Sequence, residues 1–156
     1  MKILLATDGS TFSEAAEKTV TTMIRPQDVE VLVLQAVEPL VFAVPPQMAP
    51  GYAPEQAARM QETVDLAKKN TELVTARLRA AGFKADSWVV ESDGRNGILD
   101  TAAEWKPDLI VLGSQGRKGI AKFLLGSVAD AVARHATCSV FIVRTPGTAK
   151  AESLAA

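Results

Sequence analysis

Residues 109–127 begin Leu-Ile-Val-Leu-Gly-Ser-Gln-Gly, continue through nine further residues, and end in Gly-Ser. The four apolar residues predict a buried strand, and a helical pattern starts at Val128. The glycines therefore lie where a strand turns towards a helix. Unpaired N–H groups and the helix dipole attract anions at such a turn, and glycine lets a phosphate approach the backbone. This spacing predicts a nucleotide-binding loop.

The rest of the chain alternates short apolar runs with helical patterns. Strands are predicted at residues 2–6, 29–37, 84–91, 108–112 and 139–143. Helices are predicted at about 11–24, 57–81, 97–105 and 126–136. This alternation predicts an α/β fold, with a five-stranded parallel doubly wound sheet and helices on both faces.

Several local signals set the expected boundaries. Thr11 and Glu14 have the spacing of a capping box, and Gly82 is placed to end the longest helix. Proline-rich residues 39–54 are predicted to form a loop. We expect one domain over residues 1–145 and a frayed, flexible tail over 146–156.

Composition restricts the classes of partner. The chain has 47% apolar and 22% charged residues and a net charge of −1, which is typical of globular proteins and gives no basic surface for nucleic acid. Its single cysteine, Cys138, cannot form an intrachain disulfide, which favours a reducing compartment. No apolar run is long enough for a membrane span or a signal peptide, so we expect a cytoplasmic protein without membrane contact.

A second group of residues is expected near the glycines. In a doubly wound sheet, ligands bind beyond the carboxyl ends of the strands where the strand order reverses. The first strand ends at Thr7-Asp8-Gly9-Ser10, and the fourth ends at Gly113. If these strands are neighbours, Asp8 faces the glycine loop. A carboxylate beside a phosphate indicates a divalent cation between them.

These same residues closely resemble the ATP-binding branch of the universal stress protein family. The matching segments are residues 3–10, 108–117, 124–129 and 134–144, so the resemblance covers nearly all of Lys2 to Arg144. The family's ATP signature is Gly, two residues, Gly, nine residues, Gly and then Ser or Thr, and Gly113, Gly116, Gly126 and Ser127 satisfy it. The resemblance implies strand order 3-2-1-4-5 in an adenine nucleotide alpha hydrolase-like fold.

The resemblance also implies roles for individual residues. The base and floor positions are Ala6, Thr7, Ala36 and Val37, with Ala36 offering backbone groups to the adenine edge. Asp8 would lie by the ribose and phosphates, with Mg²⁺ or Mn²⁺ as its partner. The expected ribose and phosphate contacts are Gly113, Gly116, Gly126, Ser127 and Val128, while Arg117 either touches phosphate or belongs to a solvated loop. Two departures are Gln115, where His is common, and residues 91–97, which replace the usual Gly-acid-Pro turn.

Simpler interpretations remain beside these roles. Gly113 and Gly116 could serve only a tight turn, Ser127 could be only an N-cap, and Asp8 could form an Asx turn that starts the first helix. His135, the only histidine, is expected to interact with helix-end carbonyls, and Cys138 to be a small buried residue.

Three hypotheses for function follow. The main one is an ATP-binding regulatory protein in the stress response, which acts as a homodimer through Ser139–Val143 and has an unidentified protein partner. The second is a weak metal-dependent ATPase or a nucleotidyl- or phosphoryl-transfer enzyme. The third is a nucleotide-free interaction module. No nucleophile–base pair and no P-loop lysine is visible in the sequence, so we expect at most slow ATP hydrolysis.

Overall fold

The computed structural model describes residues 1–39, 49–116 and 125–145, and within these ranges the side chains of 49–53 are not described. The predictions for Arg117, for most of the 39–54 loop and for the tail at 146–156 therefore lie outside the described residues. The elements in chain order are β1 (Lys2–Ala6), α1 (Thr11–Met23), β2 (Glu30–Val37), α2 (Ala49–Ala80), β3 (Lys84–Glu91), α3 (Gly94–Trp105), β4 (Leu109–Gly113), α4 (Ser127–His135) and β5 (Ser139–Val143).

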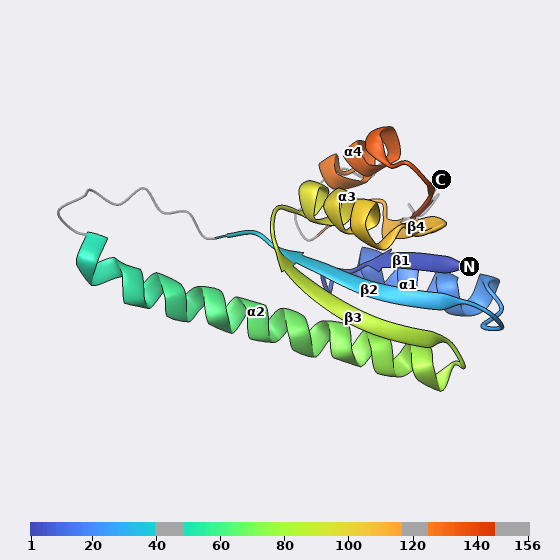
Figure 1. The fold of residues 1–156 in the computed structure, drawn as a ribbon, viewed down its shortest axis with the longest axis horizontal. Helices are drawn as coiled ribbons and strands as arrows, with labels where there is room; N and C mark the ends of the chain where they lie inside the picture. Colours follow the sequence, from blue (N-terminus) through green and yellow to red (C-terminus); the bar gives the residue numbers. More distant parts are fainter. Residues whose placement is uncertain (40–48, 117–124, 146–156) are drawn as a thin grey trace, which may run out of the picture.

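The five strands form one parallel sheet in the order β3-β2-β1-β4-β5, as predicted (Figure 1). Ile3, Leu4 and Leu5 of the central strand β1 are completely buried because both of its faces are covered. Strand β3 alternates between exposed and buried residues because it lies at an edge. The apolar runs thus mark the strands, and their continuity marks the centre of the sheet.

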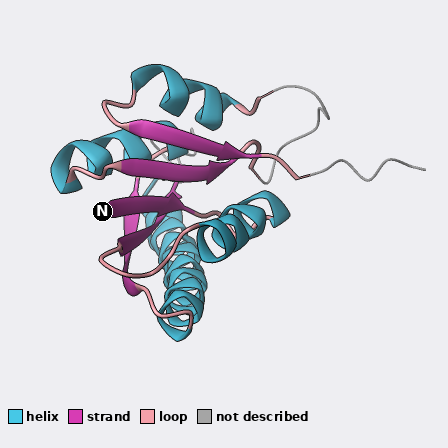
Figure 2. Ribbon diagram, turned by 90° about the vertical axis from the view of Figure 1, so that its right-hand side faces the viewer, coloured by secondary structure: helices cyan, strands magenta, loops and turns pink. Residues whose placement is uncertain are grey.

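Helices cover both faces of the sheet (Figure 2). On one face, Ala16 and Val20 of α1 and Val74 and Leu78 of α2 pack in one cluster with the sheet. On the other face, α3 and α4 contribute Ile98, Ala102, Ala129 and Val132 to a second cluster. The predicted doubly wound architecture is confirmed, and it leaves the carboxyl edge of the sheet as the natural place for a ligand.

Helix α2 differs from the prediction at its start. It begins at Ala49, so residues 49–54 belong to a helix and not to the predicted loop. Pro50 lies in the first turn, where its missing N–H has no intrahelical partner to lose, whereas Pro54 removes one bond. The helix has 32 residues, and Figure 1 shows its N-terminal part extending beyond the sheet.

The C-terminal end of α2 follows the prediction. Gly82 has φ +92°, its N–H donates to Arg79 O at 2.9 Å, and the Phe83 N–H donates to Leu78 O at 3.1 Å. This pair of bonds is a Schellman motif with Gly82 at the left-handed position. Phe83 and Leu78 are both buried in the same cluster, which fixes the entry to β3.

The two edges of the sheet are protected differently. At β3, Arg79 Nε donates to Ala85 O at 2.8 Å, and Arg79 Nη2 pairs with Asp86 Oδ1 at 2.9 Å. At β5, the three central apolar residues Val140, Phe141 and Ile142 are only half-buried, and the described residues place no strand beyond them.

Among the helices of the described residues, none is long and apolar enough to cross a membrane.

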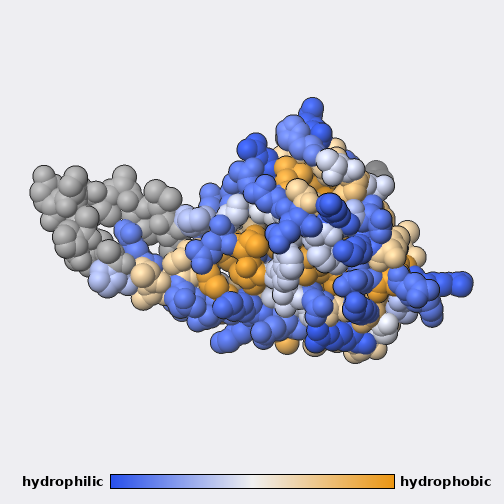
Figure 3. Space-filling view, in the orientation of Figure 1, coloured by the Kyte–Doolittle hydropathy of each residue, from blue (hydrophilic) through white to orange (hydrophobic). Residues whose placement is uncertain are grey.

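The side of the molecule that faces the viewer in Figure 1 has a mostly hydrophilic surface, with hydrophobic residues in separate patches (Figure 3). The exposed large apolar side chains include Leu66 and Leu73, which are both on α2. They lie one heptad apart on a helix whose opposite stripe, Val64 to Leu78, packs in the core.

Candidate functional site

The candidate site lies at the carboxyl edge of β1 and β4, where the strand order reverses. The two strands pair directly, with Leu5 opposite Val111. A Cβ atom added to Gly116 would lie 2.9 Å from Asp8 Oδ2, so the structure places the glycine turn against the Asp8 carboxylate. The predicted juxtaposition of the two strand ends is therefore present.

Asp8 belongs to the turn between β1 and α1. Its Oδ1 accepts a hydrogen bond from the Ser10 N–H at 3.0 Å, as in an Asx turn, and Gly9 takes φ +73°. Oδ1 thus shapes the turn while Oδ2 faces Gly116. The Asx-turn interpretation describes one oxygen of this carboxylate, and the other lies toward the glycine loop.

The same turn caps α1, one residue earlier than predicted. Ser10, and not Thr11, is the N-cap, and its hydroxyl accepts the Ser13 N–H at 3.3 Å. The capping-box interpretation of Thr11 and Glu14 was wrong because two hydroxyl residues are adjacent there and either spacing fits the pattern. The consequence is that Ser13 lies in the first turn, where it is almost fully buried beneath Thr7.

Helix α4 begins at Ser127 and has Gly126 as its N-cap. The interpretation of Ser127 as the N-cap is therefore wrong, and its side chain is exposed. Gly126 has no side chain with which to cap this helix, and the first intrahelical bond runs from the Asp130 N–H to Gly126 O at 2.9 Å. The N–H groups of Ser127, Val128 and Ala129 consequently have no intrahelical acceptor.

The start of α4 is held against the end of β4. The Gly126 N–H donates to Ser114 O at 2.8 Å, and a Cβ atom on Gly126 would lie 3.1 Å from that same oxygen. Glycine thus allows the two backbone segments to approach closely without a shift. The N–H groups in the first turn of α4, which have no intrahelical acceptor, therefore lie beside Ser114 and Gln115.

At position 113, glycine is required by a different contact. A Cβ atom there would lie 2.7 Å from the backbone carbonyl carbon and oxygen of Phe12. Glycine at the end of β4 therefore permits α1 to pack closely on the strand. This contact supports the structural interpretation of Gly113, whereas Gly116 and Gly126 face the carboxyl edge.

The end of β2 presents backbone groups to the same edge. The last described bond between β1 and β2 runs from the Thr7 N–H to Leu34 O at 2.8 Å. Because backbone directions alternate along a strand, Ala36, two residues after Leu34, directs its N–H and C=O to the same side, beyond the end of β1. The described residues show no backbone partner for these two groups. The Ala36 side chain instead faces Gly97, where an added Cβ would approach it to 2.9 Å.

Ala6 and Val37 contribute packing. Ala6 is buried in the cluster under α3 and α4, and Val37 is buried beside Val64 and Ala67 of α2. The carbonyl oxygen of Val37 accepts the Ser92 N–H at 2.9 Å, so it is already engaged.

Three polar residues that the sequence analysis did not select lie just beneath this edge. Asn70 Nδ2 of α2 donates to Gln35 Oε1 at 2.7 Å and makes a long contact of 3.5 Å with Thr7 Oγ1. The Thr7 hydroxyl donates to Ser13 Oγ at 3.2 Å. Gln35 is 6% exposed and Ser13 is 4% exposed. The available signal was a glutamine inside an otherwise apolar strand, but its partner is 35 residues away.

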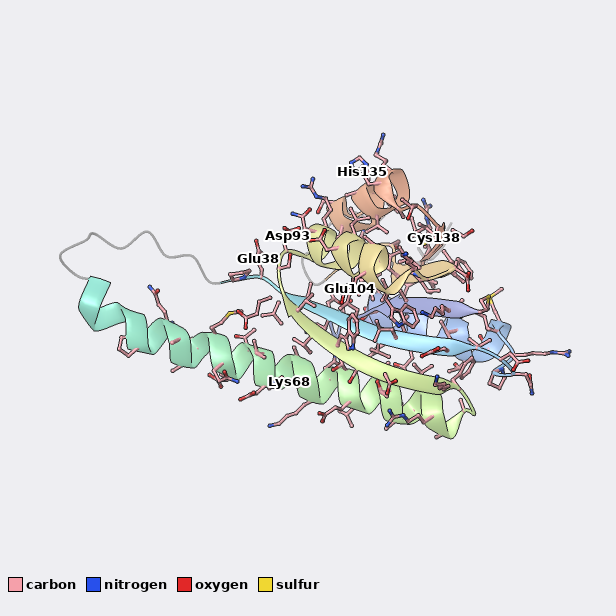
Figure 4. All side chains as sticks on the ribbon, in the orientation of Figure 1. Glu38, Lys68, Asp93, Glu104, His135 and Cys138 are labelled. Carbon is pink, nitrogen blue, oxygen red and sulfur yellow. The ribbon has the colours of Figure 1, made fainter. Side chains whose placement is uncertain are left out.

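Asp93 precedes α3, whose first residue, Gly94, lies against Val128 of α4. The Asn96 N–H donates to Asp93 Oδ1 at 3.0 Å, and this hydrogen bond lowers the pKa of the Asp93 carboxyl. Within the described residues no group of three His, Cys, Asp or Glu side chains could hold a metal by itself. Burial raises the pKa of the Cys138 thiol, and Figure 4 places Cys138 and His135 away from Asp93.

A groove between α2 and β3 lies apart from this edge. Its lining includes Thr75, Arg79, Asp86 and Trp88. Arg79 and Asp86 already pair with each other, so two of its charged groups are mutually satisfied. We assign the candidate site to the glycine turns and not to this groove.

A sequence model of the universal stress protein family matches residues 1–144. The chain belongs to the universal stress protein family. A universal stress protein of Methanocaldococcus jannaschii is 31% identical over 147 residues, which cover 93% of this chain and 82% of that one.

Solved structures share the fold of this universal stress protein. The structure of UspA from Lactobacillus plantarum has a TM-score of 0.80 and 20% identity, covering 92% of this chain and 97% of that one. A universal stress protein solved in complex with cAMP has a TM-score of 0.58 and 26% identity, covering 94% and 98% of the two chains.

Proposed function

We propose that this universal stress protein binds ATP at the carboxyl edge of β1 and β4 and uses the bound nucleotide to regulate its association. The observation that carries the proposal is the start of α4, where Gly126 gives no side-chain cap and the turn packs against Ser114. Three N–H groups and the positive end of the helix dipole lie there, which suits a phosphate group.

The adenine base is assigned to the end of β2. The N–H and C=O of Ala36 point beyond the end of β1, and together they offer one donor and one acceptor. Adenine presents an N1 acceptor and an exocyclic amino donor on one edge, whereas guanine presents a donor and a carbonyl there, so this pair favours adenine. The complex of a structural neighbour with cAMP supports an adenine ligand.

Asp8 fits a divalent cation that is shared with the phosphates. Mg²⁺ commonly takes one or two carboxylate ligands and completes its shell with phosphate oxygens and water. Oδ2 of Asp8 lies toward Gly116, and Oδ1 accepts the Ser10 N–H. When bound, Mg²⁺ or Mn²⁺ would neutralise the repulsion between this carboxylate and the phosphates.

The described residues favour binding over catalysis. His135 lies at the C-terminal end of α4, and Cys138 is a partly buried thiol with a raised pKa. Gly126 precedes the first residue of α4, whereas His135 ends this helix and Cys138 follows it. Figure 4 shows His135 and Cys138 at that C-terminal side. We therefore propose a nucleotide-dependent regulator in the cytoplasm, with ATP hydrolysis slow at most. A single free cysteine is consistent with that compartment.

Regulation requires that ATP binds two states with different affinity. We propose that one of these states is a homodimer formed through β5. Val140, Phe141 and Ile142 give this edge a half-buried apolar row. An apolar edge strand favours pairing with a second chain.

The test of ATP binding starts from gently purified protein. The protein is denatured and the released small molecules are identified by mass spectrometry, and the stripped protein is then titrated with ATP by calorimetry with and without Mg²⁺. We expect one ATP per chain, tighter binding with Mg²⁺, and at least about tenfold weaker binding of GTP, the cost of roughly one mispaired hydrogen-bonding group. Absence of ATP from both measurements would leave the interaction module as the function. Sustained phosphate release with Mg²⁺ that is lost in Asp8→Ala would favour the ATPase.

The dimer is tested separately by sedimentation. Phe141→Asp places a charge on the β5 edge and should shift micromolar protein to monomer. ATP affinity should then change by the same factor by which ATP changes the dimerisation constant, and by less than the loss of dimer affinity. Met23→Asp is the matched control, since Met23 is 70% exposed at the end of α1. A wild-type protein that is monomeric at this concentration would reject the dimer without affecting the ATP proposal.

A further inference from the structure

A chain of polar contacts connects the middle of α2 to both sides of the candidate site. Asn70 Nδ2 is 2.7 Å from Gln35 Oε1 on β2 and 3.5 Å from Thr7 Oγ1 at the end of β1. Gln35 directly precedes Ala36, whose backbone faces the proposed base position. Thr7 directly precedes Asp8, whose carboxylate faces Gly116. One side chain on α2 is thus adjacent to the base side and to the phosphate side.

The contacts continue into the Asp8 turn. Thr7 Oγ1 accepts the Gly9 N–H at 3.3 Å and donates to Ser13 Oγ at 3.2 Å. Ser13 Oγ in turn donates to Ser10 O at 2.9 Å. The hydroxyl groups of Thr7 and Ser13 therefore hold the turn that carries Asp8, and Asn70 contacts the first of these hydroxyl groups.

Burial makes these contacts important. Gln35 and Ser13 are almost fully buried, and an unpaired polar group at such depth costs more than a hydrogen bond contributes. If Asn70 moves, Gln35 Oε1 loses the hydrogen bond that Asn70 donates, and Thr7 Oγ1 loses its contact with the same amide. The position of α2 and the conformation of the Asp8 turn are consequently coupled.

We propose that Asn70 is a positioning residue that couples α2 to the nucleotide edge by holding Gln35 and Thr7 together. This inference rests on the proposed ATP site for its functional meaning, while the positioning itself is a property of the nucleotide-free chain. The N-terminal part of α2 extends beyond the sheet in Figure 1. A change in the Asp8 turn on nucleotide binding would therefore reach a part of α2 far from the glycine turns.

The first test uses nucleotide-free protein and amide hydrogen exchange followed by NMR. In Asn70→Leu, the Gly9 amide should exchange about tenfold faster, because its acceptor Thr7 is no longer supported and one hydrogen bond is worth about that factor. Lys69→Ala is the matched control, because Lys69 is the adjacent, exposed residue on α2. Unchanged Gly9 exchange in Asn70→Leu would overturn the proposal.

The second test separates positioning from stability. Asn70→Leu leaves the buried Gln35 amide without its partner, and Gln35→Met leaves the half-buried Asn70 amide without its Gln35 acceptor. The double variant replaces both partners with apolar groups and should regain most of the lost urea midpoint. We expect ATP affinity to stay about five- to tenfold weaker in this restored double variant, because Thr7 is still unsupported. Recovery of ATP affinity together with stability would show a purely structural pair and overturn the proposal. If wild-type protein binds no ATP, the proposed function fails, and the Gly9 exchange still decides whether Asn70 positions the turn.

Discussion

Helices α3 and α4 begin side by side at the same edge of the sheet, yet they differ in their N-cap residues. A Cβ atom on Gly94, the first residue of α3, would lie 3.2 Å from Val128 of α4. Helix α3 carries its own anion, because Asp93 accepts the Asn96 N–H and the Asn96 side-chain amide at 3.0 and 2.7 Å. Helix α4 has only Gly126 in the corresponding position.

The difference indicates which helix can receive a ligand. A carboxylate at the N-cap satisfies the free N–H groups and offsets the helix dipole, so an external phosphate gains little at α3. At α4 the N-cap residue Gly126 supplies no side chain to these groups. We infer that the Asp93 carboxylate occupies the N-terminus of α3, and that the N-terminus of α4 is the one suited to the proposed phosphate.

The strongest way to break this contrast is to give α4 a carboxylate cap. Gly126→Asp should weaken ATP binding at least about 100-fold, because the new charge repels the phosphates and competes for the same N–H groups. The control is Gly126→Ala, which adds the same Cβ near Ser114 O without the charge. Calorimetric titration of both variants measures the effect, and equal affinities would show that α4 does not hold the phosphates.

A milder change removes only the hydroxyl at the start of α4. Ser127→Ala should weaken ATP binding by about three- to tenfold, the value of one hydrogen bond, while the urea midpoint changes little because Ser127 is exposed. Thr11→Ala is the matched control, since Thr11 is the exposed first residue of α1. An equal loss of ATP affinity in both variants would mean that the Ser127 hydroxyl has no specific role.

The smallest effect is expected at the closed helix and depends on pH. Hydrogen bonds from Asn96 lower the pKa of Asp93 in the folded protein, so its charge stabilises the fold above the unfolded-state pKa, about 3.9. This contribution is lost as the pH falls through the folded-state value. Asp93→Asn should therefore be less stable than wild type at pH 7, and the difference in urea midpoint should shrink towards pH 3. A difference that persists unchanged at pH 3 would exclude the charge as its cause. ATP affinity should change by less than about twofold, because the two caps act on different helices.

The sequence was sufficient for the architecture because the strands are continuous apolar runs and Gly82 marks a left-handed helix end. Several helix starts were predicted wrongly. Ser10 and Thr11 both fit a cap, and only Ser10 takes that role. Asp93 was placed in a turn at 92–96, but it is the N-cap of α3, which begins at Gly94, three residues before the predicted Gly97. The prolines of residues 49–54 suggested a loop, but the first turn of a helix tolerates proline.

The candidate site was predicted in its local parts and missed in its distant ones. Asp8 and Gly116 were expected to meet because both follow neighbouring parallel strands, and they do. Asn70 gave no comparable signal, since a polar residue on a long helix is usually solvated. Its contact with Gln35 depends on how α2 lies across the sheet, which local patterns do not specify.

Arg79 has a consequence for how copies of the chain can assemble. Its guanidinium lies across the β3 edge and donates to Ala85 O, so one border of the sheet already has a polar side chain on its backbone. A sheet that could accept strands at both borders would grow into a fibre, whereas a sheet with one receptive border pairs with its own copy and stops. The proposed association through β5 would therefore stop at two chains. In this proposed assembly, Arg79 would hinder the addition of a further strand at the opposite border.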